Sequence, residues 1–296
     1  MPDSALYDVS LRIAYEFEHP AAANRTILRV QPLTSGTQQL VTGLVSTAPA
    51  HDYRRDGTDF FGNATTEITF DLPLDRIEFR FAGRVRTGAG ESVLDLSGDL
   101  SRLSAEVAET RDIGPASPHH FLGASPRVPP AAEIAAFARD VLGTAPRSAR
   151  EGVLAICDAI HAEFTFDSTA TDVTTPPIEA FLNRRGVCQD ISHVAIAALR
   201  AVGIPAAYVS GFLRTVPPPG QPRLEGADAM HAWIRAWCGA ETGWIEIDPT
   251  NAMPAGRDHI AVAIGRDYSD VAPVKGAMRS VGSHRTYQQV DVIAPA

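Results

Sequence analysis

The stretch NRRGVCQDISHVAIAALRAVG, residues 183–203, predicts one amphipathic helix with a cysteine in its first turn. The residues that share one face of this helix are Cys188, Ile191, Ser192, Ala195, Leu199 and Val202. Gly203 follows them and is typical of a helix C-terminus. Because the amino end of a helix carries partial positive charge, it favours the nucleophilic thiolate form of a cysteine. A lone cysteine at a helix start is more often structural, so the role of Cys188 depends on the rest of the chain.

The residues around Cys188 fit a reactive thiol as well as an ordinary helix start. Arg184 and Arg185 either add positive charge or point to solvent. Gly186 allows a tight turn and the close approach of a substrate. Asp190 is expected to cap or pair within the first turn. The backbone N–H groups of this turn are also suited to hold an oxyanion.

A thiolate enzyme needs a base, and the base needs a residue that orients it. The candidate base is His231, at the start of the predicted strand 231–238. The candidate orienting residue is Asp248, at the end of the predicted strand 243–248. If the two strands form an antiparallel hairpin, both residues lie at the ends far from the turn and therefore side by side. Asp248 would then accept from one imidazole nitrogen and leave the other for Cys188.

Each of these three residues has an ordinary explanation when it is taken alone. Cys188 could be a buried thiol, His231 a polar residue at a strand end, and Asp248 the cap of the turn DPTN. A helix-start cysteine followed by a strand-start histidine and a strand-end aspartate is much rarer by chance. The combination therefore favours a thiol triad.

Hydrophobic periodicity divides the chain into two parts. Residues 1–110 show short alternating runs separated by turns, which predicts an antiparallel β-sandwich domain. Residues 111–130 are rich in proline and predict a linker. Residues 131–296 combine helical patterns with further strands, which predicts an α+β catalytic domain with a helical layer on an antiparallel sheet. A helix pattern over 148–164 makes Cys157 a core residue.

Composition narrows the functional classes. The 296 residues include 45% hydrophobic and 21% charged residues, as in soluble globular proteins, and the net charge is −9. An acidic chain without a long apolar run argues against nucleic acids and membranes as partners. Cys157, Cys188 and Cys238 are widely spaced and suggest neither disulfides nor a zinc site. With no signal-peptide pattern at the start, we expect a cytoplasmic protein that needs no cofactor and no metal.

Several motifs resemble one known family. RRGVCQDISHVAIAALRAVGIPAAYVSGFL (184–213), HAWIRAW (231–237) and GWIEIDPTNA (243–252) resemble the core of the transglutaminase-like superfamily. DYRRDGTDFFGN (52–63) and HIAVAIGRDYSDVAPVKG (259–276) are similar to its bacterial members that carry an amino-terminal β domain. The resemblance thus covers most of the chain. It implies a papain-like triad, with Cys188 as nucleophile, His231 as base and acid, and Asp248 as orienting residue.

The chain departs from the family pattern at two positions. Met230 precedes the histidine where a small serine is common. Phe166 stands where relatives often have a tyrosine, whose hydroxyl can help to hold an oxyanion. The candidates for that role here are therefore Gln189 and the backbone N–H of Cys188. The calcium dependence of animal transglutaminases is not expected, since no loop with clustered carboxylates is visible.

The sequence therefore predicts an acyl-transfer enzyme that acts on an amide or peptide bond of a peptide or protein. Release of the acyl group to water would make it a cysteine peptidase or amidase, which we favour. Release to an amine would make it a protein-glutamine transglutaminase. A non-catalytic binding or scaffold protein on the same fold is the third possibility. Substrate choice is expected to depend on loops such as 214–230.

Overall fold

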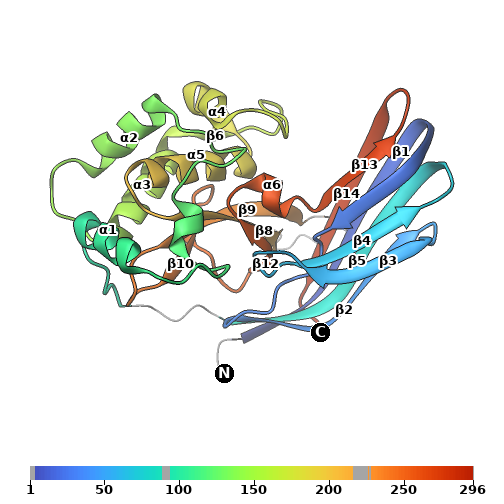
Figure 1. The fold of residues 1–296 in the computed structure, drawn as a ribbon, viewed down its shortest axis with the longest axis horizontal. Coiled ribbons are helices and arrows are strands. Elements are labelled where there is room, and N and C mark those ends of the chain that lie inside the picture. Colours follow the sequence, from blue (N-terminus) through green and yellow to red (C-terminus); the bar gives the residue numbers. More distant parts are fainter. Residues whose placement is uncertain (1–3, 89–93, 216–225, 227, 296) are drawn as a thin grey trace, which may run out of the picture.

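The computed structural model describes residues 4–88, 94–215, 226 and 228–295, and Figure 1 shows their arrangement. A layer of helices covers one side of a small antiparallel sheet, and a larger, curled sheet stands beside them. The predicted α+β fold, with a β-rich unit before a helix-on-sheet core, is confirmed. Within the described ranges, no helix is long and apolar enough to cross a bilayer.

The larger sheet is organised by one long strand, β1 (Ser4–Leu28). The first part of β1 pairs with β5 (Leu74–Gly88), and its last five residues pair with β4 (Ala64–Phe70). Pairing with β5 is irregular between Glu16 and Ala21, where β1 passes from one set of partners to the other. The outer strands are β2 (Gln38–Ala48) beside β5 and β3 (Tyr53–Thr58) beside β4. The alternating pattern predicted an antiparallel β-sandwich, and the structure has one antiparallel sheet that curls around a shared apolar cluster.

The end of the chain also belongs to this sheet. Strand β14 (His284–Ile293) pairs with β1 over ten residues, and β13 (Val274–Arg279) pairs with the far part of β1. The sequence-based division had assigned both segments to the catalytic domain, residues 131–296. Alternation identifies a strand, but its partner depends on which strand edge is free once the sheet has formed.

The connection between the two units contains a helix that the sequence analysis did not predict. Helix α1 (Leu100–Glu109) lies inside the segment assigned to the β domain, yet Leu103 and Val107 are buried in the core of the helical unit. The sequence feature that marks the start of this helix is Asp99, whose side chain accepts hydrogen bonds from N–H groups of the first turn. The proline-rich segment that follows includes the short helix η1 (Pro118–Phe121).

The core places helices on one face of a five-stranded antiparallel sheet with the order β11-β10-β9-β8-β12. Its strands are β8 (Ala206–Leu213), β9 (Ala229–Trp237), β10 (Trp244–Asp248), β11 (Met253–Pro254) and β12 (His259–Gly265). Its helices are α2 (Ala132–Leu142), α3 (Ala149–Glu163), α4 (Pro177–Asn183), α5 (Cys188–Ala201) and α6 (Tyr268–Val271). Helix α5 is the most buried of them, and its residues from Asp190 to Leu199 are all buried. Gly203 ends this helix region with a positive φ of 86°, as predicted.

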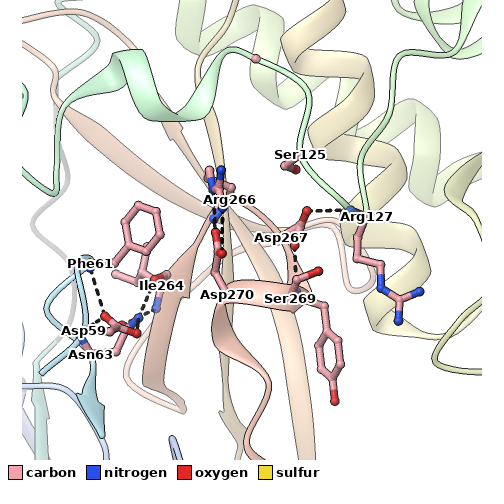
Figure 2. A network of polar contacts seen from close by, with 12 residues as sticks. Asp59, Phe61, Asn63, Ser125, Arg127, Ile264, Arg266, Asp267, Ser269 and Asp270 are labelled. Carbon is pink, nitrogen blue, oxygen red and sulfur yellow. Dashed lines mark hydrogen bonds and ion pairs between the residues drawn. The ribbon is translucent and has the colours of Figure 1, made fainter. Parts of the chain in front are cut away.

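The amino-terminal unit packs against the outer strand of the core sheet. Strand β12 pairs with β8 on one side, and two buried amides contact its backbone on the other. The Asn63 amide accepts from the N–H of Ile264 and donates to its carbonyl, both at 2.8 Å (Figure 2). Gln38 makes the same pair of bonds with Ala261, also at 2.8 Å. The amino-terminal unit therefore satisfies an edge that would otherwise be open.

Candidate active site

Cys188 is the first residue of α5, and its side chain is half-buried. The turn that leads into the helix is held by Asp190. The Asp190 carboxylate accepts the N–H of Val187 at 2.9 Å and the hydroxyl of Thr171 at 2.6 Å. This is the first-turn pairing that the sequence suggested, and it fixes the backbone on both sides of Cys188. Burial raises the pKa of Asp190.

Gly186 is required by the packing of Asp190 and not by a left-handed turn. A Cβ atom added at this position would lie 2.8 Å from both the Cβ and Oδ2 atoms of Asp190. Its φ angle is not in the left-handed region, so no special turn requires glycine here. Gly186 is therefore needed because Asp190 occupies the space of a side chain, and its backbone pairs with Phe166 in the short β6–β7 ladder (Thr165–Phe166 and Arg185–Gly186).

The two arginines before Cys188 contact other groups. The Arg184 guanidinium lies 3.8 Å from the centre of the Phe181 ring and 3.0 Å from the Glu163 carboxylate. The Arg185 side chain is 62% exposed and lies 3.9 Å from Asp167. The sequence left open whether these arginines add positive charge at Cys188 or point to solvent. In the structure they contact other side chains and solvent. The helix end and the His231 imidazolium described below are the sources of positive potential at Cys188.

His231 and Asp248 lie together, as the hairpin of β9 and β10 predicted. Ile234 and Ile247 are opposite each other in this hairpin, which brings the two strand ends to the same edge. The Nε2 atom of His231 lies 2.7 Å from Oδ2 of Asp248. The Cys188 side chain interacts with the same imidazole and contributes to the rise of its pKa. Since Nε2 is taken by Asp248, Nδ1 is the ring nitrogen that remains for the sulfur.

Asp248 is fully buried and accepts several hydrogen bonds. Its Oδ1 atom accepts the N–H groups of Thr250 at 2.9 Å and Asn251 at 3.2 Å. Its Oδ2 atom accepts the Asn251 amide at 2.7 Å in addition to His231. The same carboxylate thus caps the turn and contacts His231.

The electrostatics of this pair favour an imidazolium. Burial alone would lower the pKa of His231, but hydrogen bonds and charge interactions with Asp248 and Cys188 raise it to about 9. Burial opposes the charge of Asp248, yet its hydrogen bonds, with those from His231 and His259 first, hold the pKa of the carboxyl well below its usual range. A carboxylate, an imidazolium and a thiol therefore form one coupled group.

The site contains a residue that sequence reasoning missed. His259 begins β12, and its Nε2 atom lies 3.2 Å from the same Oδ2 atom of Asp248. His231, Asp248 and His259 offer ligand atoms within 4.8 Å of one another, a set that can hold a metal ion. Each of these atoms already takes part in a hydrogen bond within the set, so a metal would compete with the proton between His231 and Asp248. The start of β12 reaches Asp248 only when the sheet is folded, so no signal in the local sequence identifies His259.

The predicted oxyanion donors lie at the start of α5. A helix leaves the N–H groups of its first turn without carbonyl partners inside the helix, and those of Cys188 and Gln189 belong to this turn. The Gln189 side chain donates to the carbonyl of Val173 at 3.3 Å. Phe166 is 58% exposed beside Gly186. Tyr208 was not singled out from the sequence, and it is buried near the site. Burial is the largest cause that raises the pKa of Tyr208, and the charge of Cys188 is the next.

The other two cysteines lie outside this site. Cys157 and Cys238 are buried, and burial raises the pKa of both thiols, that of Cys238 to about 12. Cys157 is a core residue, as predicted. In the loop 214–230, which was expected to shape substrate choice, residues 216–225 and 227 lie outside the described residues. Met230, the departure beside His231, packs against the apolar cluster of the amino-terminal unit.

Family models match two separate parts of the chain. Residues 135–249 match the transglutaminase-like superfamily, and residues 7–86 match the bacterial transglutaminase-like N-terminal region. The first match includes all three residues of the candidate triad, and the second includes the Asn63 and Gln38 contacts with β12.

Individual relatives share parts of the chain. An uncharacterized protein of Mycobacterium tuberculosis is 45% identical over 124 residues, which are 41% of this chain and 40% of that protein. A protein-glutamine gamma-glutamyltransferase of Pseudomonas aeruginosa is 31% identical over 93 residues, which are 30% of this chain and 14% of that protein. The chain therefore spans well under half the length of these relatives.

One solved structure has the same fold over nearly the whole chain. It comes from Cytophaga hutchinsonii and is described as a candidate cysteine protease. The TM-score is 0.76 at 22% identity, and the match covers 99% of this chain and 91% of that one. At this identity the likeness establishes the fold alone.

Proposed function

The chain belongs to the transglutaminase-like superfamily, and we propose that it is a thiol-dependent acyl-transfer enzyme that acts on amide or peptide bonds. Cys188 is the nucleophile, His231 the acid and base, and Asp248 the residue that orients His231. The single observation that carries this proposal is the chain of contacts from the half-buried Cys188 through His231 to the fully buried Asp248.

The proposed reaction has two stages. The Cys188 thiolate attacks the amide carbonyl, and the resulting oxyanion accepts hydrogen bonds from the N–H groups at the start of α5. As the C–N bond breaks, the imidazolium of His231 gives the Nδ1 proton to the leaving amine, and a thioester remains. A second nucleophile then attacks the thioester while His231 takes up its proton. The C–S bond breaks, and the thiolate–imidazolium pair is restored.

The second nucleophile decides which enzyme this is. We propose water as the acceptor, and therefore a cysteine peptidase or amidase with a peptide or protein substrate. Nothing in the described part of the site marks a place for an amine or a means to exclude water. Transfer to an amine is the second candidate, favoured by the similarity to the Pseudomonas aeruginosa protein-glutamine gamma-glutamyltransferase.

The test measures both outcomes in the same protein. A panel of fluorogenic peptides and amides reports hydrolysis, and incorporation of a fluorescent primary amine into a glutamine-rich protein reports transfer. We expect hydrolysis in the wild type, its loss in Cys188→Ala, and its retention in the control Cys238→Ala. Cys188-dependent amine incorporation without hydrolysis would replace the peptidase by a transglutaminase. Activity that survives in Cys188→Ala would remove the mechanism, and the scaffold alternative would gain if neither reaction occurs.

A further inference from the structure

His259 is held in one orientation at the start of β12. Its side chain is 2% exposed, and its ring meets the Trp233 ring edge to face, with centroids 5.2 Å apart. On one side Nδ1 accepts the backbone N–H of Gly256 at 3.2 Å. On the other side Nε2 faces Oδ2 of Asp248 at 3.2 Å. Both nitrogens of this buried ring therefore have a partner.

These two contacts determine which nitrogen carries the proton. A backbone N–H is only a donor, so Nδ1 of His259 must offer its lone pair to Gly256. A neutral ring then carries its proton on Nε2, and that proton points at Asp248. His259 thus donates through Nε2 to the Asp248 carboxylate, whereas His231, which contacts the same oxygen, also interacts with Cys188.

The contact with His259 completes the set of donors that immobilises Asp248. Oδ2 accepts from His231 and Asn251, both at 2.7 Å, and from His259 at 3.2 Å. Oδ1 accepts two backbone N–H groups of the turn. Asn251 and the two N–H groups all come from this turn, directly after Asp248. Apart from His231 itself, His259 is the donor that ties the carboxylate to another strand, and so it limits rotation of the carboxylate together with its turn.

We propose that His259 is a positioning residue, which holds the Asp248 carboxylate in the orientation that directs Nδ1 of His231 toward Cys188. This inference rests on the proposed function of the triad. His259 touches neither the sulfur nor the acyl group, and it acts only through Asp248. If its role were packing against Trp233, a ring without nitrogens would serve as well.

The test is a double-mutant cycle with the reactivity of Cys188 as readout. The rate of Cys188 alkylation by iodoacetamide at pH 6.5 is followed by peptide mass spectrometry in the wild type, His259→Phe, Asp248→Ala and the double variant. We expect His259→Phe to slow alkylation about tenfold, because a hydrogen bond to a charged group is lost. In the Asp248→Ala background the same change should alter the rate by less than about twofold, because its partner is gone. Equal effects in both backgrounds, or no effect in the wild type, would overturn the proposal.

Two further measurements separate positioning from a general loss of structure. His259→Gln keeps an N–H group near the place of Nε2, and we expect it to restore alkylation to within about threefold of the wild type. The ¹⁵N spectrum of the His259 ring in the wild type should show the neutral form with the proton on Nε2. A proton on Nδ1, or a glutamine variant as slow as the phenylalanine variant, would contradict the inference. This spectrum needs no variant, so it decides even if His259→Phe fails to fold.

His231→Ala distinguishes failure of this inference from failure of the proposed function. If His231→Ala leaves the alkylation rate of Cys188 unchanged at pH 6.5, the triad itself does not operate. If His231→Ala slows alkylation but the His259 cycle is additive, the triad stands and only the role of His259 is wrong.

Discussion

Strand β12 takes part in two buried polar networks that are built differently. At its first residue, His259 contributes one of five donors that converge on the charged Asp248 carboxylate. Along its outer edge, Gln38 and Asn63 each use one neutral amide to pair with one backbone N–H and one carbonyl. We refer to the first as the carboxylate network and to the second as the amide clamp.

The difference lies in what each network stabilises. The carboxylate network concentrates charge beside a thiol, and its Asp248 carboxylate helps to raise the pKa of His231. The amide clamp carries no charge and satisfies a strand edge, so it contributes to stability and joins the two units. The clamp is itself fixed by Asp59, whose carboxylate accepts the backbone N–H of Asn63 at 3.0 Å and its amide at 3.1 Å (Figure 2).

The two segments that resemble bacterial members of the family contain several buried or half-buried polar contacts. Asp267, in the segment 259–276 that carries part of the family resemblance, accepts the N–H of Arg127 at 2.7 Å (Figure 2). Arg266 forms an ion pair with Asp270 at 2.8 Å. The second resembling segment, 52–63, contributes Asp59 and Asn63. The first segment thus contacts the connection through Asp267, and the second contacts β12 through Asn63.

The largest expected effect comes from removal of the centre of the carboxylate network. Asp248→Ala leaves five donors, one of them the buried imidazolium of His231, without their acceptor, so we expect it to lower the free energy of unfolding by about 3–5 kcal/mol. Alkylation of Cys188 at pH 6.5 should also slow. Urea unfolding and alkylation measure the two effects. Asp248→Asn is the control of similar shape, and wild-type alkylation in Asp248→Ala would show that the network does not act on the thiol.

The next effect is a dependence of stability on pH that belongs to the carboxylate network alone. The folded pKa of His231, about 9, lies above the ordinary value of 6.5. His231 therefore contributes its full stabilisation below pH 6.5 and loses it as the pH rises through 9, a change of about 3 kcal/mol. We expect the difference in unfolding free energy between the wild type and His231→Ala to shrink by that amount between pH 6 and pH 10. A difference that does not change with pH would mean that the folded state does not stabilise the His231 imidazolium.

The amide clamp should affect stability without affecting reactivity. Asn63→Leu leaves the N–H and carbonyl of Ile264 without their buried partners, so we expect a loss of about 2 kcal/mol. The loss should be the same at pH 6.5 and pH 9, and Cys188 alkylation should stay within about twofold of the wild type. Gln39→Leu, next to the clamp residue Gln38 but exposed, is a control that should change stability by less than about 0.5 kcal/mol. A slowed Cys188 would show that the clamp also sets the geometry of the site.

The smallest effect tests the turn that presents Cys188. Gly186→Ala places a methyl group 2.8 Å from Asp190, which must move and weaken its bond to the N–H of Val187. We expect a loss of about 1–2 kcal/mol and slower alkylation of Cys188. Gly36→Ala is the matched control, because nothing lies within 4 Å of the added atom. If the two variants behave alike, Asp190 does not define the start of α5.

The sequence by itself determined the parts of this protein whose information is local. The helix of Cys188 and the hairpin that joins His231 to Asp248 follow from periodicity and turn chemistry within short stretches. The resemblance of these stretches to one family, carried by their order along the chain, indicated the same three residues.

Only the tertiary structure decided which distant segments meet. In the folded chain β13 and β14 pair with β1, and the amides of Gln38 and Asn63 contact the outer edge of β12. His259 contacts Asp248, and the side chain of Asp190 occupies the space that a side chain at Gly186 would need. The physical reason is the same in each case. Alternation and spacing fix which way a side chain points, whereas its partner depends on which backbone edges and buried polar groups remain unsatisfied once the sheets have packed.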